Sequence, residues 1–198
     1  MPTDELSLLS RDLPRAVELL AEACESRSVR YALIGGLATV IHARPRFTQD
    51  VDVLIDVPQL VLPGLLDDLE RVGFDFDIVT VIRQYVDDHF TVLRFGSARI
   101  DWLKPVLPLY ARALADATLQ PWATGRSVRV ATAEGLILTK MAAFRPQDQA
   151  DIEALIAANR DSLDVSLIRR EWSAVADGED ARTQWLESAI ARLLPGGN

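Results

Sequence analysis

The segment Tyr31–Val57, YALIGGLATVIHARPRFTQDVDVLIDV, constrains the fold of this chain more than any other segment. It opens with an apolar run, turns at Gly35-Gly36, continues through a short helical pattern and closes on a strand that carries Asp50 and Asp52. Side chains two residues apart on a strand point to the same face, so the two aspartates lie together and the valines beside them face the other way. The segment therefore predicts a strand, a glycine turn, a helix and a second strand with paired carboxylates.

The paired carboxylates indicate a divalent-metal site. Two carboxylates a few ångströms apart repel each other unless a cation or a proton lies between them. No basic residue separates Asp50 from Asp52 on their face. Carboxylate oxygens are hard ligands that suit Mg²⁺. By itself, an Asp-x-Asp pair equally fits two solvated aspartates at the end of a surface strand.

The glycine pair adds a second feature. Gly35-Gly36 follows the strand Tyr31–Ile34 and precedes the helical pattern Leu37–Ala43. Glycines let backbone N–H groups approach a ligand closely, and a helix N-terminus adds partial positive charge. We therefore expect this turn to be able to hold phosphate groups, with a plain surface turn as the alternative.

Together these features resemble the DNA polymerase β-like nucleotidyltransferase superfamily, whose pattern is a glycine turn, a paired-aspartate strand and a later third aspartate. The matching positions in this sequence are Gly35, Gly36, Thr48, Asp50, Asp52 and Asp101. The resemblance implies that the three aspartates bind Mg²⁺ or Mn²⁺ and carry catalysis. It also implies that the two glycines and the threonine bind an NTP co-substrate.

One position departs from that pattern. Many superfamily members have Gly-Ser in the phosphate turn, and Gly36 stands here in place of the serine. Phosphate binding would then rest on backbone amides, Thr48, arginines or metal. Arg44 and Arg46, in the loop after the helical pattern, could reach a triphosphate, because a guanidinium matches phosphate geometry. Solvated loop arginines are the alternative.

The third aspartate lies on a predicted hairpin. Phe90–Phe95 and Ala98–Leu103 read as two strands around a Gly-Ser turn. On the second strand Asp101 shares a face with Arg99. If this strand lies beside the one that carries Asp50, three carboxylates converge, which is the geometry that two-metal phosphoryl chemistry requires. The alternative is a strand-edge carboxylate paired with Arg99.

The run GLILTKMAAFRPQDQADIEAL resembles one branch of the superfamily, the AbiEii/AbiGii-type toxin nucleotidyltransferases. The matching positions are Lys140, Arg145, Asp148 and Asp151. The resemblance implies that Lys140 contacts the triphosphate and that Asp151 orients Lys140 or the nucleotide. A surface lysine and structural salt bridges of the three other residues are the alternatives.

The remaining patterns are those of an ordinary core. We predict helices over Leu13–Glu25, Leu60–Val72 and Pro105–Ala117, a strand over Phe74–Val81, a loop around Arg83–His89, and an irregular strand pair over Leu119–Val130. Cys24 is expected in the core rather than as a nucleophile, and His42 as a packed or surface side chain. Two further helical patterns follow Val165, separated at Asp177-Gly178.

Composition excludes several classes. The chain has 198 residues and a formal net charge of −8, which disfavours long nucleic-acid substrates, because phosphate contacts need Lys and Arg. One cysteine and two histidines are too few for a typical zinc site. The N-terminal sequence lacks a signal-peptide pattern, and no apolar run approaches the roughly 18–20 residues that span a bilayer. We expect a cytoplasmic protein without a membrane partner.

These observations predict an α+β (mixed α/β) fold: a nucleotidyltransferase-like mixed β-sheet flanked by helices, with a helical C-terminal part. We expect a nucleotidyltransferase core over residues 1–130 and a helical subdomain over 131–198. The expected activity moves an NMP from an NTP to an acceptor hydroxyl and releases pyrophosphate. A toxin-like enzyme acting on RNA or protein, with a cognate antitoxin as partner, is the leading interpretation. A small-molecule, antibiotic-type transferase and a non-catalytic nucleotide- or partner-binding module are the others.

Overall fold

The computed structural model describes residues 12–43, 48, 50–123 and 125–194. Arg44 and Arg46, which the sequence proposed as triphosphate ligands, lie outside the described residues. The described helices are α1 (Leu13–Ser26), α2 (Gly35–His42), α3 (Leu62–Arg71), α4 (Ile78–Asp87), α5 (Pro108–Ala115), α6 (Ala133–Ala143), α7 (Pro146–Ala158), α8 (Val165–Ser173) and α9 (Ala181–Leu193). The described strands are β1 (Arg30–Ile34), β2 (Asp50–Asp56), β3 (Phe90–Phe95), β4 (Ala98–Leu103), β5 (Thr118–Pro121) and β6 (Ser127–Val130).

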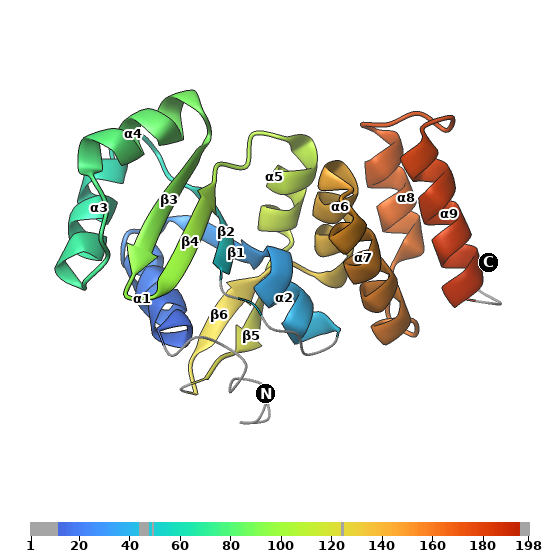
Figure 1. The fold of residues 1–198 in the computed structure, drawn as a ribbon, viewed down its shortest axis with the longest axis horizontal. Helices are drawn as coiled ribbons and strands as arrows, with labels where there is room; N and C mark the ends of the chain where they lie inside the picture. Colours follow the sequence, from blue (N-terminus) through green and yellow to red (C-terminus); the bar gives the residue numbers. More distant parts are fainter. Residues whose placement is uncertain (1–11, 44–47, 49, 124, 195–198) are drawn as a thin grey trace.

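The six strands form one mixed sheet in the order β3-β4-β2-β1-β6-β5. The pairs β2–β4 and β1–β6 are parallel, and the other neighbours are antiparallel. Helices flank this sheet, and α6 to α9 follow one another beside it toward the C-terminus (Figure 1). The predicted fold class, a mixed sheet flanked by helices with a helical C-terminal part, is confirmed.

The segment Tyr31–Val57 folds as its pattern predicts. The strand β1 runs into α2 at Gly35, whose φ of +63° lies in the left-handed region that favours glycine. The chain then returns antiparallel along β1, so that Ile34 at the end of β1 lies opposite Asp52 near the start of β2. The turn and the paired aspartates therefore meet at the same edge of the sheet.

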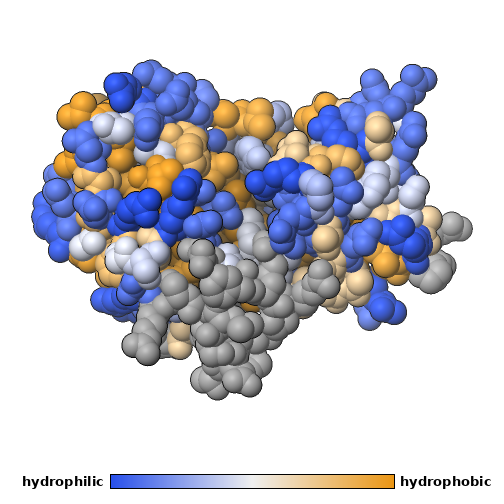
Figure 2. Space-filling view, viewed as in Figure 1, coloured by the Kyte–Doolittle hydropathy of each residue, from blue (hydrophilic) through white to orange (hydrophobic). Residues whose placement is uncertain are grey.

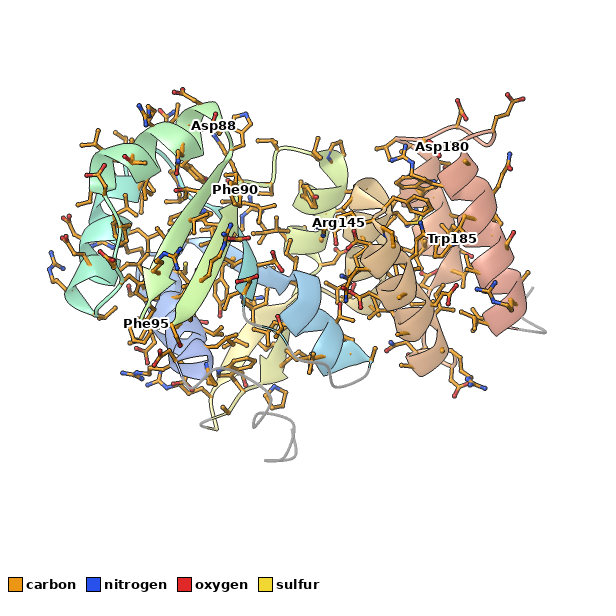
Figure 3. All side chains as sticks on the ribbon, viewed as in Figure 1. Asp88, Phe90, Phe95, Arg145, Asp180 and Trp185 are labelled. Atoms are coloured by element: carbon orange, nitrogen blue, oxygen red, sulfur yellow. The ribbon has the colours of Figure 1, made fainter. Side chains whose placement is uncertain are left out.

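The hairpin β3–β4 is also confirmed; Figure 3 labels Phe90 and Phe95 at the two ends of β3. Along β4 every second side chain is fully buried, as are Val51 and Val53 on β2. Ile100 and Trp102 thus pack on the same side of the sheet as these two valines. The opposite side of the two strands carries the polar residues, and its surface over β3 and β4 is a mosaic of hydrophilic and hydrophobic side chains (Figure 2).

Two predictions between residues 74 and 89 were wrong. The helix α4 takes the place of the second half of the strand predicted over Phe74–Val81 and of most of the loop predicted around Arg83–His89. Asp77 caps this helix, since its Oδ1 accepts a hydrogen bond of 2.8 Å from the backbone N–H of Thr80. Of the predicted strand, one bridge between Asp75 and β3 remains. Within α4 the buried residues are Val81 and Tyr85, which lie four residues apart on one face of the helix.

The C-terminal helices pack against the sheet part through α6, which contacts α2 and α5. Thr132 caps α6, because its Oγ1 accepts a hydrogen bond of 3.2 Å from the backbone N–H of Gly135, and Pro146 is the first residue of α7. Phe144, in the link between these two helices, packs edge-on against Trp185 of α9 with 5.3 Å between the ring centroids. Within the described part of the chain, no helix has the length and apolar character needed to cross a bilayer.

Candidate functional site

Asp52 and Asp101 lie side by side on neighbouring parallel strands. They are register partners across β2 and β4, so their side chains share one face of the sheet. Asp52 is largely buried, and this burial raises its pKa, with the negative charge of Asp101 as the second cause. A carboxylate held in this way gains from a nearby cation, because both causes act against its charged form.

The glycine turn holds Asp52 from the other side. The backbone N–H of Gly36 donates a hydrogen bond to the Asp52 carboxylate, which lowers its pKa and opposes the two effects above. A Cβ on Gly35 would lie 1.9 Å from Asp52 Oδ2. The first glycine is therefore the only residue type that lets the carboxylate come this close, and the second fixes the carboxylate by its amide. The turn and the aspartate strand form one unit.

Arg99 provides a positive charge that the pattern of β2 alone did not reveal. It is the register partner of Asp50 on β4, and its Nε donates to Asp101 Oδ1 at 2.6 Å. The strand β2 itself thus carries no basic residue between Asp50 and Asp52, but the neighbouring strand β4 brings Arg99 to the same face of the sheet. The alternative that sequence left open for Asp101, a pair with Arg99, is present in the structure.

Lys140 lies in a buried ion network between α6 and α7. Its Nζ is 2.7 Å from Asp151 Oδ2 and 3.7 Å from Asp148 Oδ1, with all three side chains almost fully buried. Burial acts to raise the pKa of Asp148, but hydrogen bonds from Arg145 and the charge of Lys140 outweigh it, so the pKa lies below its usual value. The surface-lysine alternative for Lys140 does not hold, since the side chain is 6% exposed.

A pocket of about 160 Å³ joins the turn to this network. The described residues that line it include Gly35, Gly36, Asp52, Lys140 and Asp151, which come from β2 and from the starts or middles of α2, α6 and α7. Arg145 lies at the same junction (Figure 3). Lys140 and Arg145 face Asp52, Asp148 and Asp151 in this lining, so two positive and three negative groups leave a formal charge of −1.

The structure therefore brings together five of the eight sequence-predicted site residues at one pocket. Thr48, Asp50 and Asp101 are not among the described residues that line it. Asp101 nevertheless neighbours Asp52 in register, Asp50 is exposed at the start of β2, and Thr48 Oγ1 donates to the backbone oxygen of Asp50 at 3.3 Å. Thr48 thus supports the strand that carries the aspartates rather than the pocket wall.

Sequence reasoning missed Tyr110. This residue of α5 lines the pocket, and burial raises the pKa of its hydroxyl, followed by the negative charge of Asp148. Its spacing on α5 fits any half-buried helix position, so nothing in the pattern marks it. His42 is a packed side chain, as expected, with Nε2 2.9 Å from the backbone oxygen of Ala131. Cys24 is buried in the core, which raises its pKa well above the ordinary value.

The donor chemistry of the aspartates fits a divalent cation. Asp52 and Asp101 offer hard oxygens on one face, and a cation beside them would offset the burial and the like charge that raise the pKa of Asp52. Among the described residues, however, no three carboxylate, imidazole or thiolate groups stand close enough together to form a metal-ligand set. One of the expected donors, Asp101, instead accepts its hydrogen bond from Arg99.

A sheet edge with a glycine turn, adjacent aspartates and a lysine-lined pocket defines a nucleotidyltransferase-like arrangement, and solved structures share this fold. An antigenic nucleotidyltransferase-like protein from Paracoccidioides brasiliensis superposes with a TM-score of 0.52 and 16% identity over 94% of this chain and 98% of that one. The structure of ANT(2″)-Ia in complex with adenylyl-2″-tobramycin has a TM-score of 0.52 and 17% sequence identity, and the match covers 82% of this chain and 95% of that one. Lincomycin-bound LnuA, a lincosamide antibiotic adenylyltransferase, has a TM-score of 0.51 and 13% sequence identity, and the match covers 73% of this chain and 96% of that one.

The likeness is one of fold, because every identity is below one fifth. No family profile and no curated protein matches the sequence. The chain therefore has the nucleotidyltransferase-like fold that the Gly-Gly and Asp-x-Asp pattern implied. The AbiEii/AbiGii branch, which the second half of the sequence resembled, finds no support among these structures.

The buried ion network gives a prediction about stability. Replacing Asp151 with asparagine leaves the buried Lys140 ammonium with Asp148, at 3.7 Å, in place of its closer charged partner, and we expect the free energy of unfolding to fall by about 3 kcal/mol. Urea denaturation measures this loss. The control is Glu187→Gln, which breaks the exposed pair Arg169–Glu187 and should change stability by less than about 1 kcal/mol. Equal losses in the two variants would contradict a buried, paired Lys140.

Proposed function

We propose that this protein is a metal-dependent nucleotidyltransferase, which moves an NMP from an NTP to an acceptor hydroxyl and releases pyrophosphate. The observation that carries the proposal is the position of Asp52. It lies between the glycine turn and Asp101, and it borders a pocket whose opposite wall presents Lys140. A structural carboxylate would not need a glycine with positive φ to make room for it, nor a like charge in the adjacent register position.

The metal ligands in this proposal are Asp50 and Asp52 on β2 and Asp101, the register partner of Asp52 on β4. Bound Mg²⁺ or Mn²⁺ would neutralise the triphosphate and lower the pKa of the acceptor hydroxyl. The protein itself fixes the carboxylates in place: Gly36 binds one of them through its amide, and the parallel register sets the second beside it. Catalysis of this kind rests on positioning and charge neutralisation.

The pocket suits the phosphate end of the nucleotide. Its volume of about 160 Å³ is below the roughly 300–1,000 Å³ that encloses a drug-sized ligand, so the base and sugar would lie outside it. Lys140 would then contact a phosphate, and Asp151 would hold the lysine in place through the 2.7 Å contact. The formal charge of −1 in the lining requires a cation to accompany the triphosphate, as the proposed metal does.

Two acceptor classes follow from different observations. A small hydroxyl-bearing molecule is favoured by the formal charge of −8, which disfavours a long polyanion, and by the antibiotic adenylyltransferases among the similar folds. A toxin-like transfer to RNA or protein, with a cognate antitoxin, is favoured by the sequence resemblance around Lys140. We put the small-molecule acceptor first.

We also propose that residues 1–130 form the catalytic core and that 131–198 form a helical subdomain packed on it. This division places the three aspartates and the glycine turn in the first part and Lys140 in the second. The contact of α6 with α2 and α5 supports the idea that the second part completes the pocket instead of standing apart.

The test follows transfer of label. Purified protein is incubated with each α-labelled NTP and Mg²⁺ or Mn²⁺, together with total RNA, a protein extract, or small acceptors such as tobramycin and lincomycin. Pyrophosphate release is measured in parallel. The Asp50→Asn/Asp52→Asn double variant is the control for contaminating activity, since both changes are near-isosteric.

Each result identifies one of the proposed functions. Label on a small molecule, absent with the double variant, supports the first proposal, and label on RNA or protein supports the toxin-like one. NTP binding without transfer to any acceptor indicates a non-catalytic nucleotide-binding module. A protein that neither binds NTP nor releases pyrophosphate is not a nucleotidyltransferase.

A further inference from the structure

Arg99 stands among all three aspartates of the candidate site. It is the register partner of Asp50, and its Nε donates to Asp101 at 2.6 Å. The hydrogen bond to Asp101 raises the pKa of the guanidinium, and the charges of Asp50 and Asp52 add to this effect. A single side chain of β4 thus balances a face that carries three carboxylates.

The Arg99–Asp101 pair also explains why the described aspartates do not form a ready ligand set. Asp101 is turned to the guanidinium, whose planar N–H groups match a carboxylate well. Arg99 holds Oδ1 of Asp101, so a divalent cation on either oxygen of this carboxylate would lie within a few ångströms of the guanidinium. At such a distance the two positive groups repel each other strongly.

We propose that Arg99 is a resident counter-ion which a divalent cation must displace from Asp101, so that metal binding and opening of the Arg99–Asp101 pair are one event. This inference rests on the proposed function, because it takes the three aspartates as the metal ligands.

The displacement is within reach of a metal ion. The Arg99 side chain is 42% exposed, so the freed guanidinium can enter water at small cost. An apparent dissociation constant is raised by the inverse of the fraction of molecules in the binding-competent state. For a partly exposed ion pair this factor is about five. Removal of Arg99 should therefore tighten metal binding and should destabilise the metal-free protein.

The main test compares two arginines on the same face. Mn²⁺ affinity is measured by calorimetry on chelator-treated wild type, Arg99→Met and Arg94→Met. Arg94 is the exposed register partner of Arg99 on β3, one strand further from Asp50, so its loss makes the same charge change without breaking the pair. We expect Arg99→Met to bind Mn²⁺ about fivefold more tightly than wild type, and Arg94→Met to stay within about twofold.

A second measurement uses the wild-type protein alone, so that it does not depend on how a variant folds. The Nε–H resonance of Arg99, assigned by its loss in Arg99→Lys, is followed by NMR during a titration with diamagnetic Mg²⁺. We expect this resonance to shift toward that of a free arginine with the same midpoint as metal binding. A resonance that stays unchanged at saturating Mg²⁺ would overturn the inference.

The outcomes separate the inference from the proposed function. Mn²⁺ binding that is equal in wild type and Arg99→Met overturns the displacement of Arg99 by the metal ion and leaves the metal site in place. Binding that is weak in wild type and clear in Arg99→Met supports both. Absence of Mn²⁺ binding in all three proteins removes the metal site itself, and the inference with it.

Discussion

Replacement of Gly35 by alanine is expected to lower the rate of nucleotidyl transfer by 100-fold or more. The new Cβ would lie 1.9 Å from Oδ2, 2.5 Å from Cγ and 2.7 Å from Cβ of Asp52, so the aspartate must move. A misplacement of about 1 Å at a reacting group costs on the order of 100-fold in rate. The loss is measured as pyrophosphate release at saturating NTP, with the acceptor identified by label transfer.

The substitution has a second effect, which a control must separate. Gly35 has a φ of +63°, and an alanine in the left-handed region costs about 1–2 kcal/mol of stability wherever it occurs. Gly125 has a φ of +79°, and a Cβ added there would meet nothing within 4 Å beyond its chain neighbours, so it carries this backbone cost alone. We expect Gly125→Ala to lose stability in urea but to keep wild-type transfer. Full activity in Gly35→Ala would show that Asp52 is not held by the turn.

The sequence predicted most of the turn because its signals are local. Strand, glycine pair, helix and Asp-x-Asp all lie within one segment, and side-chain alternation along β2 follows from strand geometry alone. The sequence does not say which of the two glycines makes room for the Asp52 carboxylate, since either one fits the pattern. Because β2 returns antiparallel to β1 and sets Asp52 opposite Ile34, the residue in close contact with this carboxylate is Gly35.

The wrong prediction between residues 74 and 89 has a local cause as well. Phe74, Phe76, Ile78 and Thr80 alternate with other residues as on a strand, but Asp77 caps a helix and the buried positions follow a helical spacing. Asp77, an N-cap residue type directly before an apolar helical pattern, was available as a helix-start signal. The prediction followed the two-residue alternation instead of this signal. In so short an apolar run, the two-residue period of a strand and the 3.6-residue period of a helix are hard to distinguish.

The charges of the site depend on non-local pairing. No residue of β2 itself is basic, yet the parallel register of β2 and β4 puts Arg99 directly across from Asp50. Likewise, the buried pair of Lys140 with Asp151 and the position of Tyr110 at the pocket depend on how α5, α6 and α7 pack. Register and helix packing are set by the whole core, so the counter-charges of a site are less predictable than its ligands.

Asp101→Asn and Asp52→Asn are expected to separate binding from chemistry. We propose that Asp52 touches both metals, including the one that travels with the triphosphate, and that Asp101 touches only the metal that activates the acceptor. Asp101→Asn should then bind a non-hydrolysable NTP with Mg²⁺ almost as wild type does and lose at least about 100-fold in transfer. Asp52→Asn should lose both NTP binding and transfer. Calorimetry and the transfer assay, run on both variants, measure the two properties.

The control for these variants is Asp56→Asn. Asp56 lies on the same strand and the same face as Asp52 but at the far end of β2, where it pairs with Arg30. We expect this variant to transfer label at the wild-type rate, so a loss there would point to a general effect of charge on the strand. If Asp101→Asn instead keeps full transfer, the carboxylate serves only as the partner of Arg99, and the catalytic metal must be held by Asp50 and Asp52 without it.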